Sequence, residues 1–331
     1  MNKFVTIGDV ARHAGVSVAT VSRIHNGIAG RATPETVARV QQSIEALDYR
    51  PHSVSRALKM KQSRIVGVLV ANLANPAMAA IAESIEESLR SKGYVMALCD
   101  THERPDIQDQ YLREMESHLA IAVVMVVAVK SEMLVRLQKQ GRPIVFVARR
   151  DPLRKNSSFV GIDDFAAGET VAKYCISEKL NSPCVIYSSL EHSADSLRFA
   201  GVKERYKQIE KSKKIPNFTI PARNHLEIGY QAARDCMKIY PATDALICLS
   251  DLIAYGAYRW IREHKSKCQL APRIFGFDDN PLNDWINPWL TSVRFPYQAL
   301  GATVVDSLTS MLENNSPQDY VLPHQLIVRS Q

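Results

Sequence analysis

From Arg64 onward, short apolar runs alternate with amphipathic stretches of helical period, and this rhythm constrains the fold more than any other feature. The first runs lie at residues 65–70, 95–99, 121–127 and 144–147. Apolar runs that are separated by helices are typical of parallel strands buried on both faces of a sheet. The rhythm resumes after Asp163, so the sequence predicts an α/β fold with two doubly wound lobes.

The remaining elements follow from the same pattern. Helices are expected near residues 77–91, 106–118 and 131–140, and then near 166–179, 194–210, 227–239, 251–264 and 297–312. Further strands are expected near residues 183–187, 244–249, 273–277 and 290–295. Ligands of doubly wound folds bind beyond the carboxyl ends of the strands, so residues that follow a strand are the candidates for a binding site.

The N-terminal segment has a different pattern, which predicts three short helices. Thr6, Ser17 and Thr33 are suited to cap them, and Gly15 provides the tight turn between the first and the second. The apolar stripes are Ile7, Val10, Ala11 and Ala14, then Val21 and Ile24, and then Val37, Val40, Ile44 and Leu47. Three such helices bury one small core, and the second is free to present its outer face to a DNA major groove.

Periodicity alone fits a helical hairpin with a solvated outer face equally well. The distribution of charge separates the two interpretations. Residues 1–63 contain nine Lys and Arg against four acids, which places +5 of the chain's net charge of +7 in this segment. Such asymmetry is expected of a module that contacts phosphates, so the segment is interpreted as a helix-turn-helix that binds DNA.

Two motifs resemble those of the lactose-repressor/galactose-repressor (LacI/GalR) family of bacterial transcription regulators. Residues 16–23 (VSVATVSR) are similar to the family's recognition helix, and Tyr49-Arg50-Pro51 with Val54, Ala57 and Leu58 is similar to its hinge. The resemblance covers essentially the whole chain. It implies that the DNA contacts come from Thr6, Ser17, Val18, Ala19, Thr20, Ser22, Arg23, Asn26, Tyr49, His52, Ser53, Arg56 and Leu58. His25 and His52 depart from the family pattern.

The hinge at residues 51–63 is polar and basic, and by itself it fits a flexible linker between domains. The resemblance implies instead a short helix that forms when two copies meet on the operator. Leu58 would then wedge into the minor groove, where unstacking a base step costs a few kcal/mol and is offset by wider contact.

The resemblance also implies a domain organisation: a helix-turn-helix domain (1–48), a hinge (49–63) and a periplasmic-binding-protein-like core (64–331). Lobe 1 is expected at about 64–162 and 294–320, and lobe 2 at about 163–293 and 321–331. The cleft between the lobes is expected to hold a small effector. The expected effector contacts are Asn75, Arg149, Arg150, Asp163, Arg198, Asp251 and Asp278. For any one acid at a strand end, a helix cap or a salt bridge is an equally good interpretation.

Two departures bear on the effector. The family usually has aromatic residues directly after the Asn75-Pro76 pair, where this chain has Ala77 and Met78. Arg149 and Arg150 are adjacent, which suits a sugar acid or a sugar phosphate. Alternatively, one of the two arginines points to solvent or to a dimer interface.

Composition excludes several classes. No apolar run approaches the length of a signal peptide or a membrane span, so a cytoplasmic protein without membrane contact is expected. The six cysteines form no C-x-x-C pair and are expected to pack as small apolar side chains. Neither a nucleophile elbow, a phosphate-binding loop nor metal-ligand spacing is present, so no catalysis, cofactor or metal is expected.

These features predict a homodimeric transcription regulator, a repressor, that binds a pseudo-palindromic operator and responds to a sugar or sugar derivative. The chain has no leucine heptad after its last strand, so a tetramer through a C-terminal coiled coil is not expected. The alternatives are a solute-binding protein or an enzyme on the same two-lobed fold.

Overall fold

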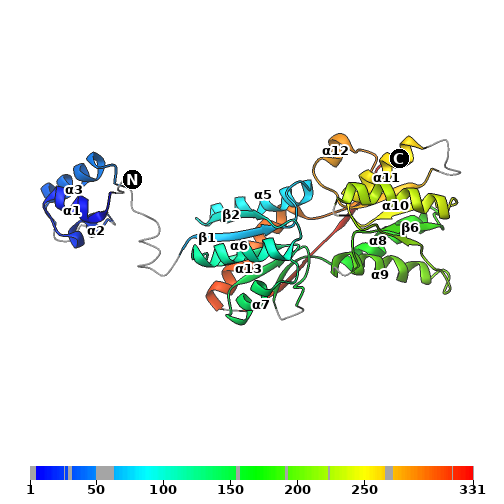
Figure 1. The fold of residues 1–331 in the computed structure, drawn as a ribbon, viewed down its shortest axis with the longest axis horizontal. Helices are drawn as coiled ribbons and strands as arrows, with labels where there is room; N and C mark the ends of the chain where they lie inside the picture. The colour runs from blue at the N-terminus through cyan, green and yellow to red at the C-terminus, as the bar shows by residue number, and fades with distance from the viewer. Residues whose placement is uncertain are drawn as a thin grey trace. The chain divides into compact units, whose positions relative to one another are not determined.

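The computed structural model describes residues 5–25, 27–28, 32–49, 63–153, 157–190, 193–222, 224–264, 271–314 and 316–330. The chain divides into two compact units, Met1–Ser63 and Arg64–Gln331 (Figure 1).

The first unit contains helices α1 (Ile7–Ala14), α2 (Val18–His25) and α3 (Pro34–Ala46). The three predicted caps are confirmed, since Thr6, Ser17 and Thr33 each accept a hydrogen bond from a backbone N–H three residues on. Gly15 ends α1 with φ 65°, a conformation that glycine adopts without strain. The buried core consists of Val10, Ala11, Ala14, Val21, Ile24 and Val40, all from the predicted stripes.

The first lobe of the second unit is built on a parallel sheet of six strands. They are β1 (Ile65–Val70), β2 (Val95–Asp100), β3 (Ala122–Val126), β4 (Ile144–Val147), β5 (Ser158–Ile162) and β11 (Asp319–Leu322), in the order β11-β5-β4-β3-β1-β2. Helices α5 (Pro76–Ser91) and α13 (Tyr297–Asn314) pack on one face. Helices α6 (Pro105–Ser117) and α7 (Glu132–Lys139) pack on the other, as Figure 1 shows.

The second lobe repeats this arrangement. Its strands are β6 (Pro183–Ile186), β7 (Asn217–Phe218), β8 (Ala245–Cys248), β9 (Arg273–Asp278), β10 (Thr291–Arg294) and β12 (Gln325–Ile327), in the order β12-β10-β9-β8-β6-β7. Helices α8 (Asp164–Ser177) and α9 (Ser193–Lys207) cover one face, and α10 (His225–Ile239) and α11 (Asp251–Glu263) cover the other. A short helix, α12 (Asn283–Ile286), follows β9. Strand β12 pairs with β10 in the antiparallel direction, so this sheet is not wholly parallel.

Helices α10 and α11 approach so closely that only glycine fits at their contact. A Cβ at Gly229 would lie 1.9 Å from the carbonyl oxygen of Ile253, and one at Gly256 would lie 1.9 Å from that of Leu226. Cys236 on α10 and Cys184 and Cys248 in the strands beneath are buried and pack as small apolar side chains.

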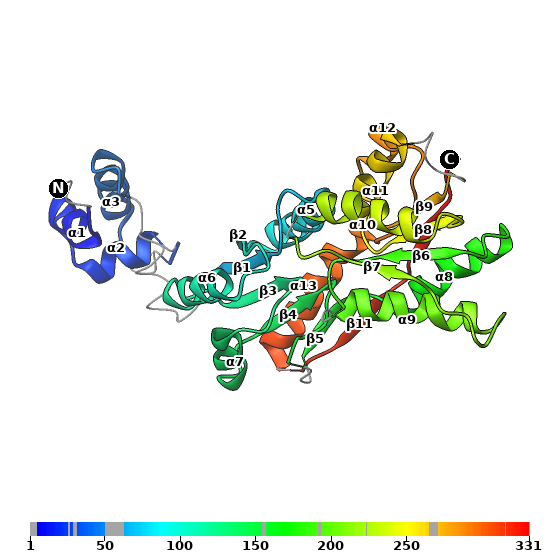
Figure 2. The same ribbon diagram turned by 45° about the vertical axis from the view of Figure 1, so that its right-hand side comes forward.

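The chain passes between the lobes after β5, after β10 and after β11 (Figure 2). The last passage differs from expectation. Val321 and Leu322 pair with β5 in the first lobe, so the chain leaves that lobe after residue 322 rather than 320. The predicted strands and helices are present, whereas β5, β7, β11 and β12 were not anticipated, because short strands are recognised only through partners distant in sequence.

Candidate functional site

The second unit contains a cavity of about 950 Å³, and both lobes line it. The residues that follow β1, β2, β3 and β4 form one wall, and those that follow β6, β8 and β9 form the other. This is the position expected for a ligand site in a doubly wound fold. Four of the expected effector residues line it: Asn75, Arg149, Arg198 and Asp278.

Several backbone segments around the cavity adopt left-handed conformations. After β2, His102 and Glu103 each have φ 52°; after β3, Val127 has φ 63°; and after β4, Ala148 has φ 62°. Asp278, at the end of β9, has φ 120°. Non-glycine residues in such regions are strained, and strain of this kind clusters at ligand sites.

Arg198 is held firmly in the second wall. Its Nε donates to Asp164 Oδ1 at 2.8 Å, and its Nη1 donates to the carbonyl oxygen of Leu249, also at 2.8 Å. Its guanidinium lies 4.9 Å from the ring centre of Phe277. Burial opposes the charge of Arg198, but nearby carboxylates, chiefly Asp164, keep its pKa above the ordinary value. The side chain therefore stays charged at the cavity wall.

The carboxyl groups of Asp251 and Asp278 lie at different depths. Asp251 does not line the cavity. It is buried behind the wall, where it accepts hydrogen bonds from Ser292 Oγ at 2.6 Å and Asn283 Nδ2 at 2.8 Å. Burial raises the pKa of Asp251 to about 6. Asp278 faces the cavity, and burial together with the charge of Asp251 raises its pKa well above the ordinary value.

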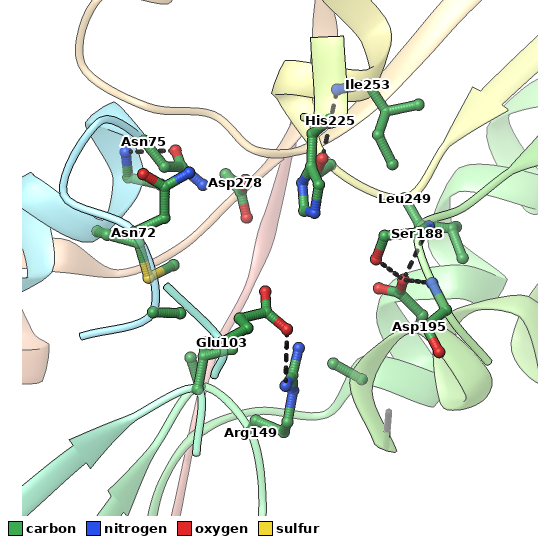
Figure 3. Close-up of a pocket in the computed structure, with 18 of the residues that line it drawn as sticks. Asn72, Asn75, Glu103, Arg149, Ser188, Asp195, His225, Leu249, Ile253 and Asp278 are labelled. Carbon is green, nitrogen blue, oxygen red and sulfur yellow. Dashed lines mark hydrogen bonds and ion pairs between the residues drawn. The ribbon is translucent and has the colours of Figure 1, made fainter. Parts of the chain in front are cut away.

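The first wall is built from Asn72, Asn75, Glu103 and Arg149 (Figure 3). Asn75 caps α5, accepting from the Ala77 N–H at 3.0 Å. The Arg149 Nη1 lies 3.4 Å from Glu103 Oε2, longer than the usual 2.7–2.9 Å of such bonds. The Arg149 Nε is buried and has no hydrogen-bond partner among the residues that the structure describes.

Three expected effector residues lie elsewhere, and the structure corrects them. Arg150 is exposed, forms an ion pair with Asp319 and lies 4.1 Å from the ring centre of Phe159. Asp163 is the N-cap of α8, where it accepts from the Ala166 N–H at 2.9 Å. Asp251 supports the wall from behind, as described above. The alternative interpretations therefore apply to the other two residues. Asp163 is a helix cap, and Arg150 faces solvent.

Sequence reasoning missed several residues of the cavity. Glu103 and Ser188 follow β2 and β6, so the strand-end rule would have found them. Asp195 precedes Arg198 by about one helical turn on α9. His225 is the first residue of α10 and does not directly follow a strand. The strand-end rule therefore did not point to it.

Helix α2 of the first unit exposes the side chains that were expected to read DNA. Val18 is 45% exposed, Ala19 and Arg23 are exposed, and Thr20 and Ser22 are half-buried. The Ser17 hydroxyl lies 2.9 Å from that of Thr20. The backbone N–H of Thr6, at the start of α1, donates to Asp9 Oδ2 at 2.9 Å.

Tyr49 is half-buried, and its ring lies edge-on to His25 with centres 6.3 Å apart. This contact gives the departure at His25 a packing role. Asn26, His52, Ser53, Arg56 and Leu58 lie outside the described residues.

Comparison with known proteins decides the family. Residues 63–329 match the profile of the periplasmic binding proteins and sugar binding domain of the LacI family. Residues 6–52 match that of the bacterial regulatory proteins, lacI family. The chain belongs to the LacI family. It is therefore an effector-controlled DNA-binding regulator, and the predicted family, fold class and general function are confirmed.

The relatives of this LacI-family chain include two repressors. The ribose operon repressor of Halalkalibacterium halodurans is 28% identical over 98% of this chain and 96% of its own length. The repressor PurR of Photorhabdus laumondii is 29% identical over 93% of this chain and 91% of its own length.

Solved structures share the fold. The lac repressor dimer bound to operator and an anti-inducer matches with a TM-score of 0.83 and 20% identity over 99% of both chains. A LacI-family regulator from Enterococcus faecium with bound ribose matches with a TM-score of 0.68 and 23% identity over 80% of this chain and 97% of its own.

The described residues include no helix with the length and apolar character needed to cross a membrane. They also include no group of three or more His, Cys, Asp or Glu residues arranged to hold a metal ion.

Proposed function

We propose that this protein is a transcriptional repressor that binds a pseudo-palindromic operator as a homodimer. Its affinity for DNA is set by a small polyhydroxylated molecule bound between the lobes. The observation that carries the proposal is the outer face of α2, which exposes the apolar Val18 and Ala19 beside Arg23. A face of this kind suits contact with thymine methyl groups and phosphates in a major groove.

The edge of the first sheet supports the homodimer. Strand β2 is the outermost strand of that sheet, and Val95 and Leu98 on it are 60% and 39% exposed. Apolar side chains on an edge strand are an aggregation hazard unless a partner covers them. We assign a second copy of the chain as this partner. Two identical helix-turn-helix units then require a DNA site with two related halves.

The chemistry of the cavity supports a sugar-type effector. Amide groups from Asn72 and Asn75, the carboxyl group of Asp278 and the guanidinium of Arg198 suit adjacent hydroxyl groups. The names of the ribose operon repressor and of the ribose-bound structure agree with this class. We infer that the cavity binds this molecule without converting it, and that the protein acts in the cytoplasm, where bacterial operators are.

The first test is enrichment of random and genomic DNA by the full-length protein, with and without a metabolite extract. We expect a pseudo-palindrome whose recovery changes when the extract is added. Val18→Asp should abolish the enrichment because the new carboxylate repels DNA, whereas Glu45→Gln, at an exposed position of α3, should preserve it. Enrichment of no sequence under either condition would overturn the proposal.

The second test is sedimentation of two matched variants. Val95 and Ile239 are both 60% exposed, but only Val95 lies on the edge strand β2. We expect Val95→Lys to shift the protein towards monomer and Ile239→Lys to leave it dimeric. A dimer that survives Val95→Lys unchanged would contradict the assigned interface.

A further inference from the structure

Two arginines reach the same cavity, but their donors are used to different extents. Arg198 makes two hydrogen bonds of 2.8 Å, to Asp164 and to the Leu249 carbonyl. Within the described residues, the Arg149 guanidinium makes a single long polar contact, 3.4 Å to Glu103, although the Arg149 side chain is only 10% exposed. Its Nε has no partner within the described part of the chain. A buried donor left unsatisfied is unfavourable, so Arg149 has binding capacity that its protein neighbours do not use.

Glu103 holds its place opposite Arg149 on a strained backbone. Both Glu103 and the preceding His102 have φ 52°. The Glu103 side chain is 30% exposed, so its carboxylate is able to move towards water. In Figure 3 this carboxylate points into the cavity above the Arg149 guanidinium. Its position is therefore that of an acid group which a ligand is able to replace.

A second unused nitrogen enters from the other lobe. His225 is the first residue of α10 and lines the cavity, with its ring pointing inward (Figure 3). Its Nδ1 is buried and has no hydrogen-bond partner among the described residues. Arg149 and His225 therefore offer donors from opposite lobes to the same space.

The other carboxyl groups of the cavity oppose an anion less than their number suggests. Asp106 forms an ion pair with Arg104, and Asp195 accepts a hydrogen bond from Ser188 Oγ at 2.8 Å, which satisfies part of its carboxylate. Burial and the charge of Asp251 raise the pKa of Asp278, so its carboxyl group takes up a proton more readily than an ordinary aspartate. Arg150, the exposed neighbour of Arg149, pairs with Asp319 and takes no part.

Building on the proposed function, we propose that the effector carries an anionic group, a carboxylate or a phosphate. This group displaces the Glu103 carboxylate from Arg149 and accepts a second hydrogen bond from His225. The hydroxyl groups of the ligand then face Asn75 and Asp278. Because Arg149 and His225 belong to different lobes, the anion joins the two walls of the cleft, and binding favours the closed arrangement.

The test uses sodium phosphate and sodium acetate as probes of the two anionic groups, at matched ionic strength. Binding to the full-length protein is measured by calorimetry for the wild type, Glu103→Gln, Arg149→Met and Arg150→Met. We expect Glu103→Gln to bind one of the probes about tenfold more tightly than the wild type, because the competing carboxylate is gone. Arg149→Met should lose this binding, and Arg150→Met should match the wild type.

The two probes distinguish the sources of the charge. Phosphate binding that depends on Arg149 assigns a phosphorylated effector, and acetate binding that depends on Arg149 assigns a sugar acid. Binding of neither probe to Glu103→Gln, or equal losses in Arg149→Met and Arg150→Met, overturns the inference.

Different outcomes refute the anionic effector and the proposed function. If a neutral sugar such as D-ribose released operator DNA from the wild type and from Arg149→Met to the same extent, the anionic effector would be refuted while the effector-controlled regulator stood. If no operator is enriched at all, the regulator itself is refuted.

Discussion

The two walls of the effector cleft hold their arginines in opposite ways. In the second lobe, charged groups are paired at short distances, such as Arg198 with Asp164 at 2.8 Å and Asp251 with Ser292 at 2.6 Å. In the first lobe, Arg149 and Glu103 lie 3.4 Å apart, and the backbone at Ala148 is left-handed.

This difference indicates a division of labour. A wall whose hydrogen bonds are already made is preorganised, and it gains little from rearranging when a ligand arrives. An arginine with an unused donor and a long contact, such as Arg149, has more to gain, and a ligand that satisfies it shifts the protein towards the bound arrangement. We therefore expect the second lobe to provide stability and the first lobe to provide the response.

The largest expected effect comes from removing the buried charge in the second wall. Arg198→Met leaves Asp164 buried without its partner, which should destabilise the lobe by about 3–5 kcal/mol. Urea unfolding followed by tryptophan fluorescence measures this directly, since Trp260, Trp285 and Trp289 all lie in the second lobe. Adding Asp164→Leu should recover part of the loss. A loss below about 1 kcal/mol would show that this wall is no more firmly held than the other.

The next effect concerns pH and Asp251. Its pKa in the folded protein, about 6, lies above the ordinary value of 3.8, so folding favours the protonated form. The stability linked to this group is fully present below about pH 4 and is lost as the pH rises through 6, a change of about 2–3 kcal/mol. Urea unfolding of the wild type and Asp251→Asn at pH 4.5 and 7 should show a steeper slope in the wild type. Asp164 and Asp278, whose pKa values burial also raises, contribute to the slope of both proteins.

The comparison with Asp251→Asn isolates Asp251 from groups of opposite sign. Burial lowers the pKa of His324, so its contribution to stability increases with pH in the same range. An identical pH dependence in the wild type and Asp251→Asn would contradict the assignment. Asp9, in the first unit, behaves in the opposite sense to Asp251, because hydrogen bonds from Thr6 and Arg12 lower its pKa to about 2.

The sequence predicted well those features that depend on local patterns. Alternating apolar runs predicted four strands of each sheet, since periodicity is a local property. The rule that ligands bind at strand ends placed Arg149 and Asp278 correctly at the cavity.

The other site residues could not be predicted because their positions depend on ion pairs and hydrogen bonds between residues far apart in the sequence. Arg149 and Arg150 are chemically identical neighbours, and they separate because Asp319, which is 169 positions further along, captures Arg150. Asp251 and Asp278 both stand at strand ends, but Asn280, Asn283 and Ser292 surround only Asp251. Such partners come together only in the folded chain.

A smaller effect is expected from repeating the arginine substitution on the first wall. Arg149→Met should change the free energy of unfolding by less than about 1 kcal/mol, because the Glu103 carboxylate is already 30% exposed and rehydrates. The same urea titration, read by circular dichroism so that both lobes report, measures the change beside Arg198→Met. Equal losses in the two variants would remove the distinction between the walls.

The smallest effect tests whether the first wall stores strain. Ala148 has φ 62°, a conformation that costs a non-glycine residue about 1–2 kcal/mol and glycine nothing. Ala148→Gly relieves this strain but increases the entropy of the unfolded chain by about 0.5–1 kcal/mol. We therefore expect a net gain of about 0.5 kcal/mol in urea unfolding.

Ala122→Gly is the matched control, because Ala122 is buried in β3 of the same sheet with ordinary strand geometry. There no strain is relieved, and the entropy term adds to the loss of a buried methyl group, so a loss of about 1–2 kcal/mol is expected. The opposite signs of the two changes would show that the backbone beneath Arg149 is strained. Equal losses would mean that the first wall is relaxed, and its readiness to respond would then rest on the unused donors of Arg149 alone.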